Sequence, residues 1–211
     1  SHLIVEDTER DPLTYHQLIT RTFLLGAAIR KHTKPNENVG VLLPNMITTL
    51  GCFFGLQVFD RIPAMLNYST SHHNVLNACQ IARIQVVITA RKFIAASMLS
   101  DLVETLKSDN ISIIYLEDLS SGITIQNKLK ALVVAYAPQT YYSLVNKVRD
   151  PESPAVVLFT SGSEGLPKGV VLSHKNLQCN RQQISAVIDL TSRDVAFNAL
   201  PLFHAFGLSG G

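Results

Sequence analysis

Charged residues are scarce in this sequence. They make up 16% of its 211 residues, against 46% for hydrophobic residues, and the mean hydropathy is +0.19. A disordered chain would be polar and highly charged, so the composition excludes one. Lys+Arg (18) nearly balances Asp+Glu (16), and the net charge of +2 gives no positive field for wrapping nucleic acid. We therefore expect a globular chain without a nucleic-acid partner, large enough for one large domain or parts of two.

Cysteine is also rare. Cys52, Cys79 and Cys179 are widely spaced and odd in number. A disulfide framework would need an even and dense set, so a reducing, cytoplasmic setting fits better. The first residues show neither the charged nor the apolar region of a signal peptide. Because the chain begins with Ser1 rather than Met, we expect a processed or shortened chain.

One uncharged run, residues 39–59, is long enough to resemble a membrane span. Polar interruptions at Pro44-Asn45, at Thr48-Thr49 and at Gln57 argue against that interpretation. The pattern divides instead into a short buried strand, a turn and a buried helix.

Short apolar runs alternate with helical patterns along the chain. This alternation predicts an α/β fold with a mainly parallel sheet flanked by helices. Crossover helices would bury both faces of the sheet, which explains the low charge. The polar stretch 146–154 is the best boundary, so we expect a first subdomain over residues 1–150 and the start of a second over 151–211. The expected strands are 39–43, 62–66, 86–89, 111–116, 155–160, 170–173 and 195–200. The expected helices are 13–31, 46–59, 71–84, 93–106, 123–145 and 174–187. Thr14 is the expected N-cap of the first helix, and Pro138 is expected to interrupt the helix 123–145.

Residues 156–174, VVLFTSGSEGLPKGVVLSH, carry the most informative pattern. An apolar strand leads into a loop with three glycines, three hydroxyls and Lys168. Glycines let backbone N–H groups approach a ligand closely, hydroxyls add donors and the lysine adds charge, which together predict a cradle for a polyanion such as a nucleoside triphosphate. The spacing fits neither a Walker A loop nor a G-x-S-x-G nucleophile elbow. The alternative is a solvent-exposed loop that joins two strands.

The segment TSGSEGLPKG resembles the phosphate-binding loop of the adenylate-forming (AMP-binding) superfamily, which includes acyl-CoA synthetases, luciferases and the adenylation domains of peptide synthetases. The commoner loop of that family is TSGTTGxPKG, so Ser163 and Glu164 depart from it. A carboxylate beside phosphates is repulsive, so Glu164 must point away or contact another group. The resemblance implies that ATP is the cofactor and that Lys168 is catalytic. The implied ATP-binding residues are Thr160, Ser161, Gly162, Ser163, Glu164, Gly165, Lys168 and Gly169.

A second match to the family is LPLFHAFG, residues 200–207. This motif lies beside the acyl pocket in the family, so the resemblance implies that Phe203, His204 and Gly207 line the substrate pocket and that His204 is catalytic. A buried, hydrogen-bonded core histidine is the alternative for His204. The segments 63–68 and 115–119 narrow the resemblance to the acyl-acyl-carrier-protein synthetase part of bacterial bifunctional 2-acylglycerophosphoethanolamine acyltransferases.

The resemblance implies a two-step reaction. ATP and a fatty acid give an acyl-adenylate and pyrophosphate, and the pantetheine thiol of acyl carrier protein then takes the acyl group. The alternative within this class is a fatty acyl-CoA synthetase, with CoA as acceptor. The alternatives from other classes of protein are a non-catalytic nucleotide- or lipid-binding module and a structural α/β domain. The parent protein would serve lysophospholipid reacylation at the cytoplasmic face of the bacterial inner membrane.

Several later motifs of the family have no counterpart in these residues. They are the adenine-binding segment with its metal-binding Glu, the ribose-binding Asp, the hinge and the C-terminal domain with its catalytic Lys. We therefore expect the protein ligand of Mg²⁺ to lie outside this chain and no metal site within it. We also expect these 211 residues alone to be inactive, and membrane association to come only from other parts of the parent protein.

Overall fold

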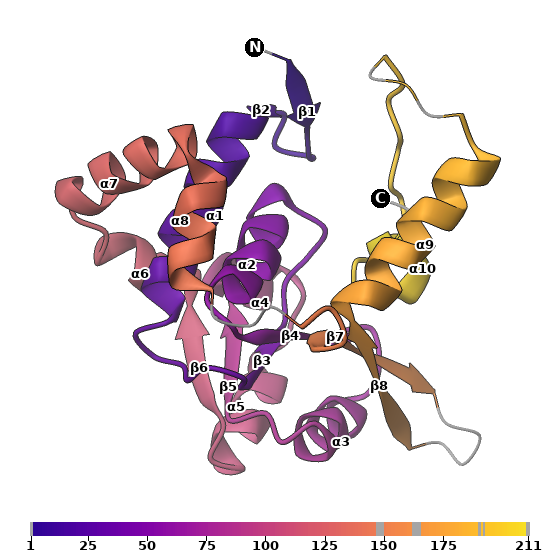
Figure 1. The fold of residues 1–211 in the computed structure, drawn as a ribbon. Coiled ribbons are helices and arrows are strands. Elements are labelled where there is room, and N and C mark those ends of the chain that lie inside the picture. Colours follow the sequence, from indigo (N-terminus) through magenta and orange to yellow (C-terminus); the bar gives the residue numbers. More distant parts are fainter. Residues whose placement is uncertain (1, 147–149, 162–165, 190, 192, 210–211) are drawn as a thin grey trace.

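The centre of the molecule is one six-stranded sheet with the order β6-β5-β3-β4-β7-β8 (Figure 1). The computed structural model describes residues 2–146, 150–161, 166–189, 191 and 193–209. Neighbouring strands pair in parallel, except that β8 is antiparallel to β7. The predicted mainly parallel α/β fold is thereby confirmed. The strands of this sheet are β3 (Asn38–Val41), β4 (Ile62–Met65), β5 (Val86–Thr89), β6 (Ser112–Tyr115), β7 (Pro154–Ser161) and β8 (Pro167–Ser173).

Helices cover both faces of the sheet because side chains alternate between the faces along each strand. On one face, Val39 and Val41 pack with Phe53 and other apolar residues of the first two helices. On the other face, Leu42 packs with Leu102 and its neighbours. The helices are α1 (Tyr15–Ile29), α2 (Ile47–Val58), α3 (His72–Ile81), α4 (Arg91–Ala96), α5 (Ser100–Ser108), α6 (Leu116–Ser121), α7 (Ile125–Tyr136), α8 (Pro138–Val145), α9 (His174–Val187) and α10 (Ala205–Ser209).

Two glycines allow α1 and α2 to approach closely. A Cβ atom added to Gly26 would lie 2.5 Å from the carbonyl oxygen of Gly55, and one added to Gly55 would lie 2.9 Å from the backbone nitrogen of Gly26. Any side chain at either position would therefore force the two helices apart. This contact holds α2 against α1. It thereby also positions the turn that precedes α2.

Polar caps define where the main helices begin. Thr14 caps α1 as predicted, since its hydroxyl accepts from the Gln17 N–H while the Gln17 side chain accepts from the Thr14 N–H. Ser173 and Asn176 form the same reciprocal arrangement at α9. Such a capping box satisfies N–H groups that a helix start otherwise leaves unpaired.

The expected helix 93–106 is wrong: two helices, α4 and α5, occupy this region. Met98 adopts a left-handed conformation (φ 53°), and the Leu99 N–H donates to the carbonyl of Ile94 at 3.0 Å. This C-terminal motif ends α4 and turns Leu99 into the core, where it is buried. The expected interruption of helix 123–145 at Pro138 is confirmed, since α7 ends at Tyr136 and α8 begins at Pro138.

The expected strand 195–200 is also wrong. These residues are irregular, and Val195 and Phe197 are 94% and 93% exposed. Their alternating pattern suits a strand, but a strand needs a partner edge, and no strand in the described ranges pairs with them. The sequence also failed to indicate α6, α10 and the short hairpin of β1 (Leu3–Val5) and β2 (Leu13–Thr14).

The uncharged run 39–59 forms most of β3, a turn and all of α2, as the sequence predicts. Within the described residues, no helix has both the length and the apolar character needed to cross a bilayer. β7 and β8 extend the sheet formed by the preceding strands. The division into subdomains at residue 150 stays a prediction.

Candidate functional site

The glycine-rich motif connects two strands that pair directly. In the β7–β8 hairpin, Thr160 lies opposite Lys168 and Ser161 lies opposite Pro167. Thr160, Ser161 and Lys168 are exposed. Gly162, Ser163, Glu164 and Gly165, four of the predicted ATP-binding residues, lie outside the described residues. The hairpin places the others at the carboxyl end of β7, where ligands bind in open α/β sheets.

Lys168 is available for an anion. It forms no ion pair with a carboxylate in the described part of the chain, unlike Lys175, whose ammonium lies 2.5 Å from Glu152. An exposed ammonium beside two hydroxyls is a point charge with flexible reach, suited to phosphate oxygens. Gly169 lies opposite Phe159, and a Cβ there would meet its nearest atoms at 3.7 Å, so packing does not require glycine at this position.

A small depression of about 80 Å³ adjoins the hairpin. Asn67, Thr70 and Asn74 line it together with Thr160 and Ser161, and none of its lining residues within the described ranges is acidic. Hydroxyl and amide groups can donate to phosphate oxygens, so this lining fits the phosphates of a nucleotide. Sequence reasoning missed Asn67, Thr70 and Asn74. The signal that could have found them is their place after β4, whose carboxyl end meets the same edge as that of β7.

The LPLFHAFG segment is fastened to the same edge by Asn45. The Asn45 amide donates to the carbonyl of Leu200 at 2.7 Å, and its oxygen accepts from the Leu202 N–H at 2.8 Å. Asn45 belongs to the turn that follows β3, at the carboxyl end of that strand. The sequence indicated only a turn there, because a hydrogen-bonded pair about 155 residues apart leaves no local pattern.

Phe203 is buried in the core, and its ring meets that of Tyr68 edge-on at 4.9 Å. Tyr68 follows Asn67, which lines the depression beside the hairpin. Of two consecutive residues after β4, Tyr68 therefore contacts the LPLFHAFG segment, and Asn67 lines the same depression as Thr160 and Ser161. The structure thus brings the glycine-rich hairpin and the LPLFHAFG segment to one edge of the sheet.

His204 and Gly207 occupy different environments within that segment. His204 is exposed, and its ring lies 4.7 Å from that of Phe203. Gly207 is buried, and a Cβ there would lie 2.2 Å from the carbonyl oxygen of Pro201. Gly207 is therefore required for the close packing of α10 on the backbone of Pro201. The catalytic role of His204 and the pocket-lining roles of Phe203, His204 and Gly207 stay predictions.

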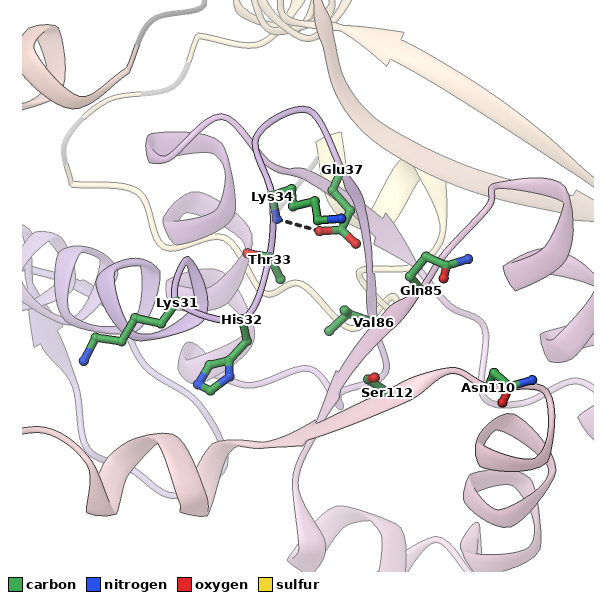
Figure 2. A pocket seen from close by; sticks show the side chains of 9 residues that line it. All are labelled: Lys31, His32, Thr33, Lys34, Glu37, Gln85, Val86, Asn110 and Ser112. Carbon is green, nitrogen blue, oxygen red and sulfur yellow. Dashed lines mark hydrogen bonds between the residues drawn. The ribbon is translucent and has the colours of Figure 1, made fainter.

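A larger pocket, of about 380 Å³, opens at the opposite edge (Figure 2). Glu37, Val86 and Ser112 line it at the amino ends of β3, β5 and β6, and the Glu37 carboxylate accepts from the Lys34 N–H at 2.6 Å. None of the predicted site residues lines it. It lies away from the carboxyl ends of the strands, where the motifs gather.

Half-buried His174 begins α9 beside this amino edge, because β8 runs antiparallel. Desolvation lowers the pKa of His174 below its ordinary value. A helix N-terminus also disfavours an imidazolium, so the position suits a neutral ring. Among the described residues, no group of three His, Cys, Asp or Glu side chains is arranged to hold a metal ion.

The chain resembles known proteins along its whole length. The profile described as AMP-binding enzyme matches residues 2–211. Long-chain fatty acid transport protein 2 of Rattus norvegicus is 24% identical over 226 residues, covering 100% of this chain and 35% of that protein. The long-chain-fatty-acid–CoA ligase of Bacillus subtilis is 24% identical over 216 residues, covering 93% of this chain and 39% of that protein. The chain thus spans about a third of the length of these curated relatives.

The fold has solved counterparts. The structure of ATP-bound MatB from Rhodopseudomonas palustris superposes with a TM-score of 0.74 at 20% identity, covering 99% of this chain and 40% of that chain. At this identity the likeness establishes the fold, which is that of the N-terminal domain of adenylate-forming enzymes. Taken with the match over residues 2–211, it leads to one conclusion: the chain belongs to the AMP-binding family of adenylate-forming enzymes.

Proposed function

We propose that this chain carries the phosphate-binding part of an ATP-dependent ligase that activates fatty acids as acyl-adenylates. The observation that carries the proposal is the β7–β8 hairpin, which presents the exposed Lys168, Thr160 and Ser161 at the carboxyl edge of the sheet. The family match and the relatives named as fatty-acid ligases and transport proteins support it.

In the proposed first step, a carboxylate oxygen of the fatty acid forms a bond to the α-phosphorus of ATP. The bond from that phosphorus to the bridging oxygen breaks, and pyrophosphate leaves with the electron pair. The Lys168 ammonium would hold the β- and γ-phosphates and stabilise the negative charge that grows on pyrophosphate. The hydroxyls of Thr160 and Ser161 would donate hydrogen bonds to the same oxygens.

Mg²⁺ is proposed as the companion of ATP, with oxygen ligands. The described residues provide no cluster of metal-ligating side chains, so we assign it no residue of this chain. Phe203 and His204 would lie beside the acyl group. The buried Phe203 would hold one position there, and the exposed His204 would be free to change its side-chain conformation.

In the proposed second step, a thiol attacks the acyl carbonyl carbon, AMP leaves and a thioester forms. We propose acyl carrier protein as the acceptor in a lysophospholipid-reacylating parent at the cytoplasmic face of the inner membrane. Coenzyme A is the competing acceptor, and the Bacillus subtilis relative, named a CoA ligase, favours it.

The test is fatty-acid-dependent ATP–pyrophosphate exchange by the full-length protein that contains this chain. We expect exchange in the full-length protein and none in the 211 residues alone. Thioester formation is then measured with acyl carrier protein and with CoA in separate reactions, which decides the acceptor. ATP binding without exchange at any fatty-acid chain length would contradict the proposal and favour a non-catalytic binding module.

A further inference from the structure

Helix α7 has its amphipathic pattern reversed. It packs against α1 through small residues, since Ala131 and Ala135 are 5% and 6% exposed. Its large apolar residues face outward, with exposed fractions between 44% and 82%. We call these the α7 stripe: Ile125, Leu129, Leu132, Val133 and Tyr136.

The α7 stripe is continuous. At 100° per residue its five members fall within a sector about 100° wide, on the side of the helix opposite Ala131 and Ala135. A surface helix of a soluble domain normally turns such a stripe toward the core. An exposed stripe of this kind marks a surface that is covered by something else.

The charge around the stripe has one sign. Between Asp118 and Asp150 the sequence contains no acidic residue, although acidic and basic residues are nearly equal in number over the whole chain. Lys128 and Lys130 of α7 are exposed on either side of the stripe. The partner of this surface is therefore expected to be apolar inside and anionic at its boundary.

Tyrosines are concentrated at the same place. Three of the chain's six tyrosines, Tyr136, Tyr141 and Tyr142, lie at the end of α7 and in α8. The Tyr136 ring meets that of His16 edge-on at 4.7 Å, and the Tyr141 ring meets that of Phe23 edge-on at 5.1 Å, both on α1. The Lys130 ammonium lies 6.0 Å from the centroid of the Tyr141 ring. Because the Tyr136 and Tyr141 rings pack on α1, the assignment rests on the apolar stripe and its flanking lysines, a combination typical of helices that lie at a membrane–water interface.

We propose that α7 docks on an anionic phospholipid bilayer, lying along its surface with the α7 stripe inserted and Lys128 and Lys130 at the headgroups. At 12 residues α7 is about 18 Å long, which suits lying along a bilayer rather than crossing it. The inference rests on the proposed function in one respect, because fatty acids partition into bilayers and a docked enzyme would take them from there. It replaces the expectation that only other parts of the parent protein contact membranes.

The sequence contains no tryptophan, which permits a direct test. Val133→Trp places a single reporter on the α7 stripe, and Val187→Trp places a matched one on α9, at a residue that is 86% exposed. The full-length protein that contains this chain, with any tryptophan outside these 211 residues replaced by phenylalanine, is mixed with vesicles of phosphatidylcholine and phosphatidylglycerol in equal parts, without ATP or fatty acid. We expect a blue shift of the Val133→Trp emission and none for Val187→Trp.

Vesicle flotation measures the binding itself. Leu129→Gln with Val133→Gln is expected to weaken binding about tenfold or more, while Met98→Gln with Val187→Gln leaves it unchanged. Lys128→Glu with Lys130→Glu is expected to lower binding about tenfold or more on the mixed vesicles but not on phosphatidylcholine alone, with Lys31→Glu and Lys92→Glu as the matched pair. All substituted residues except these lysines are apolar and more than half exposed, and circular dichroism verifies that each variant folds.

Equal blue shifts at both reporters, or equal flotation of stripe and control variants, would overturn the proposal. A stripe variant that converts a dimer into a monomer, without wild-type binding to vesicles, would overturn it too and assign the stripe to a second copy. Because no nucleotide is present, loss of vesicle binding is distinct from loss of ATP–pyrophosphate exchange, which tests the proposed function.

Discussion

The two edges of the central sheet differ in whether a cationic side chain is hydrogen-bonded within the protein or exposed. At the amino edge, the guanidinium of Arg61 donates to the hydroxyl of Thr33 and to the carbonyls of Arg30, Thr33 and Phe59. At the carboxyl edge, Lys168 is exposed and forms no ion pair with a described carboxylate. Polar groups that are satisfied internally hold the fold together, and groups left free can bind a ligand.

Pocket volume alone would place the ligand site at the amino edge instead. The amino-edge pocket has about 380 Å³, against about 80 Å³ for the depression beside the hairpin. The larger space is lined by the ends of strands where no motif residue gathers. We place the proposed phosphate site at the strand carboxyl ends, where the exposed Lys168 and the motif residues gather, and not in the larger space. The predictions below test this contrast between a structural edge and a functional one.

The largest effect on stability is expected from Arg61→Ala. Arg61 is only 9% exposed, and its removal leaves several buried carbonyls without their donor. We expect a loss of about 3 kcal/mol in the free energy of unfolding, measured by urea denaturation. Arg181→Ala on the exposed surface of α9 is the control, and an equal loss in both variants would remove the structural role of the amino edge.

A smaller loss of stability is expected from Asn45→Ala. This substitution tests the carboxyl edge, as Arg61→Ala tests the amino edge. The substitution removes both hydrogen bonds to the 200–207 segment, so we expect about 2 kcal/mol of lost stability. It should also lower fatty-acid-dependent exchange severalfold, since the segment beside the proposed acyl site loosens. Asn45→Asp keeps the acceptor for the Leu202 N–H and should lie between Ala and wild type. Full activity in Asn45→Ala would show that the segment is not part of the site.

The smallest effect concerns pH at the amino edge. The pKa of His174 is lowered in the folded state, so protonation favours the unfolded chain. The stabilising contribution is present above the ordinary histidine pKa of about 6.5 and is lost as the pH falls through the lowered value. His174→Gln is expected to flatten this acid-side decline in urea midpoints between about pH 7 and pH 5, whereas His73→Gln on the exposed side of α3 should not. An unchanged decline in His174→Gln would contradict the assignment.

The mainly parallel sheet, the Thr14 cap and the two strands beside the glycine-rich motif could be predicted from local sequence patterns. Helical periodicity, continuous apolar runs and glycine spacing are properties of neighbouring residues. The first helix shows the periodicity, and β7 shows a run of four consecutive buried residues. The break at Met98 could not be predicted, because it depends on Leu99 being drawn into the core beneath α4. The strand expected at 195–200 failed for a related reason, since alternation cannot reveal whether a partner edge exists.

The sequence motif of the site could be predicted, but the residues that join it from distant parts of the chain could not. Lys168 and Thr160 stand out in the sequence, but Asn45, Asn67 and Asn74 reach the same edge from turns and helices far away in the chain. The reversal of α7 was hidden for a similar reason. Its apolar residues have helical spacing, and only the structure shows that Ala131 and Ala135 face the protein instead.

The most direct test of the account is one that contrasts the two edges in a single assay. Lys168→Ala and Lys34→Ala each remove one exposed ammonium, the first from the hairpin and the second from the amino-edge pocket. In the full-length protein, we expect Lys168→Ala to reduce fatty-acid-dependent ATP–pyrophosphate exchange about 100-fold or more and Lys34→Ala to leave it within about twofold. Equal rates in the two variants, or a larger loss in Lys34→Ala, would contradict the assignment of the phosphate site to the carboxyl edge.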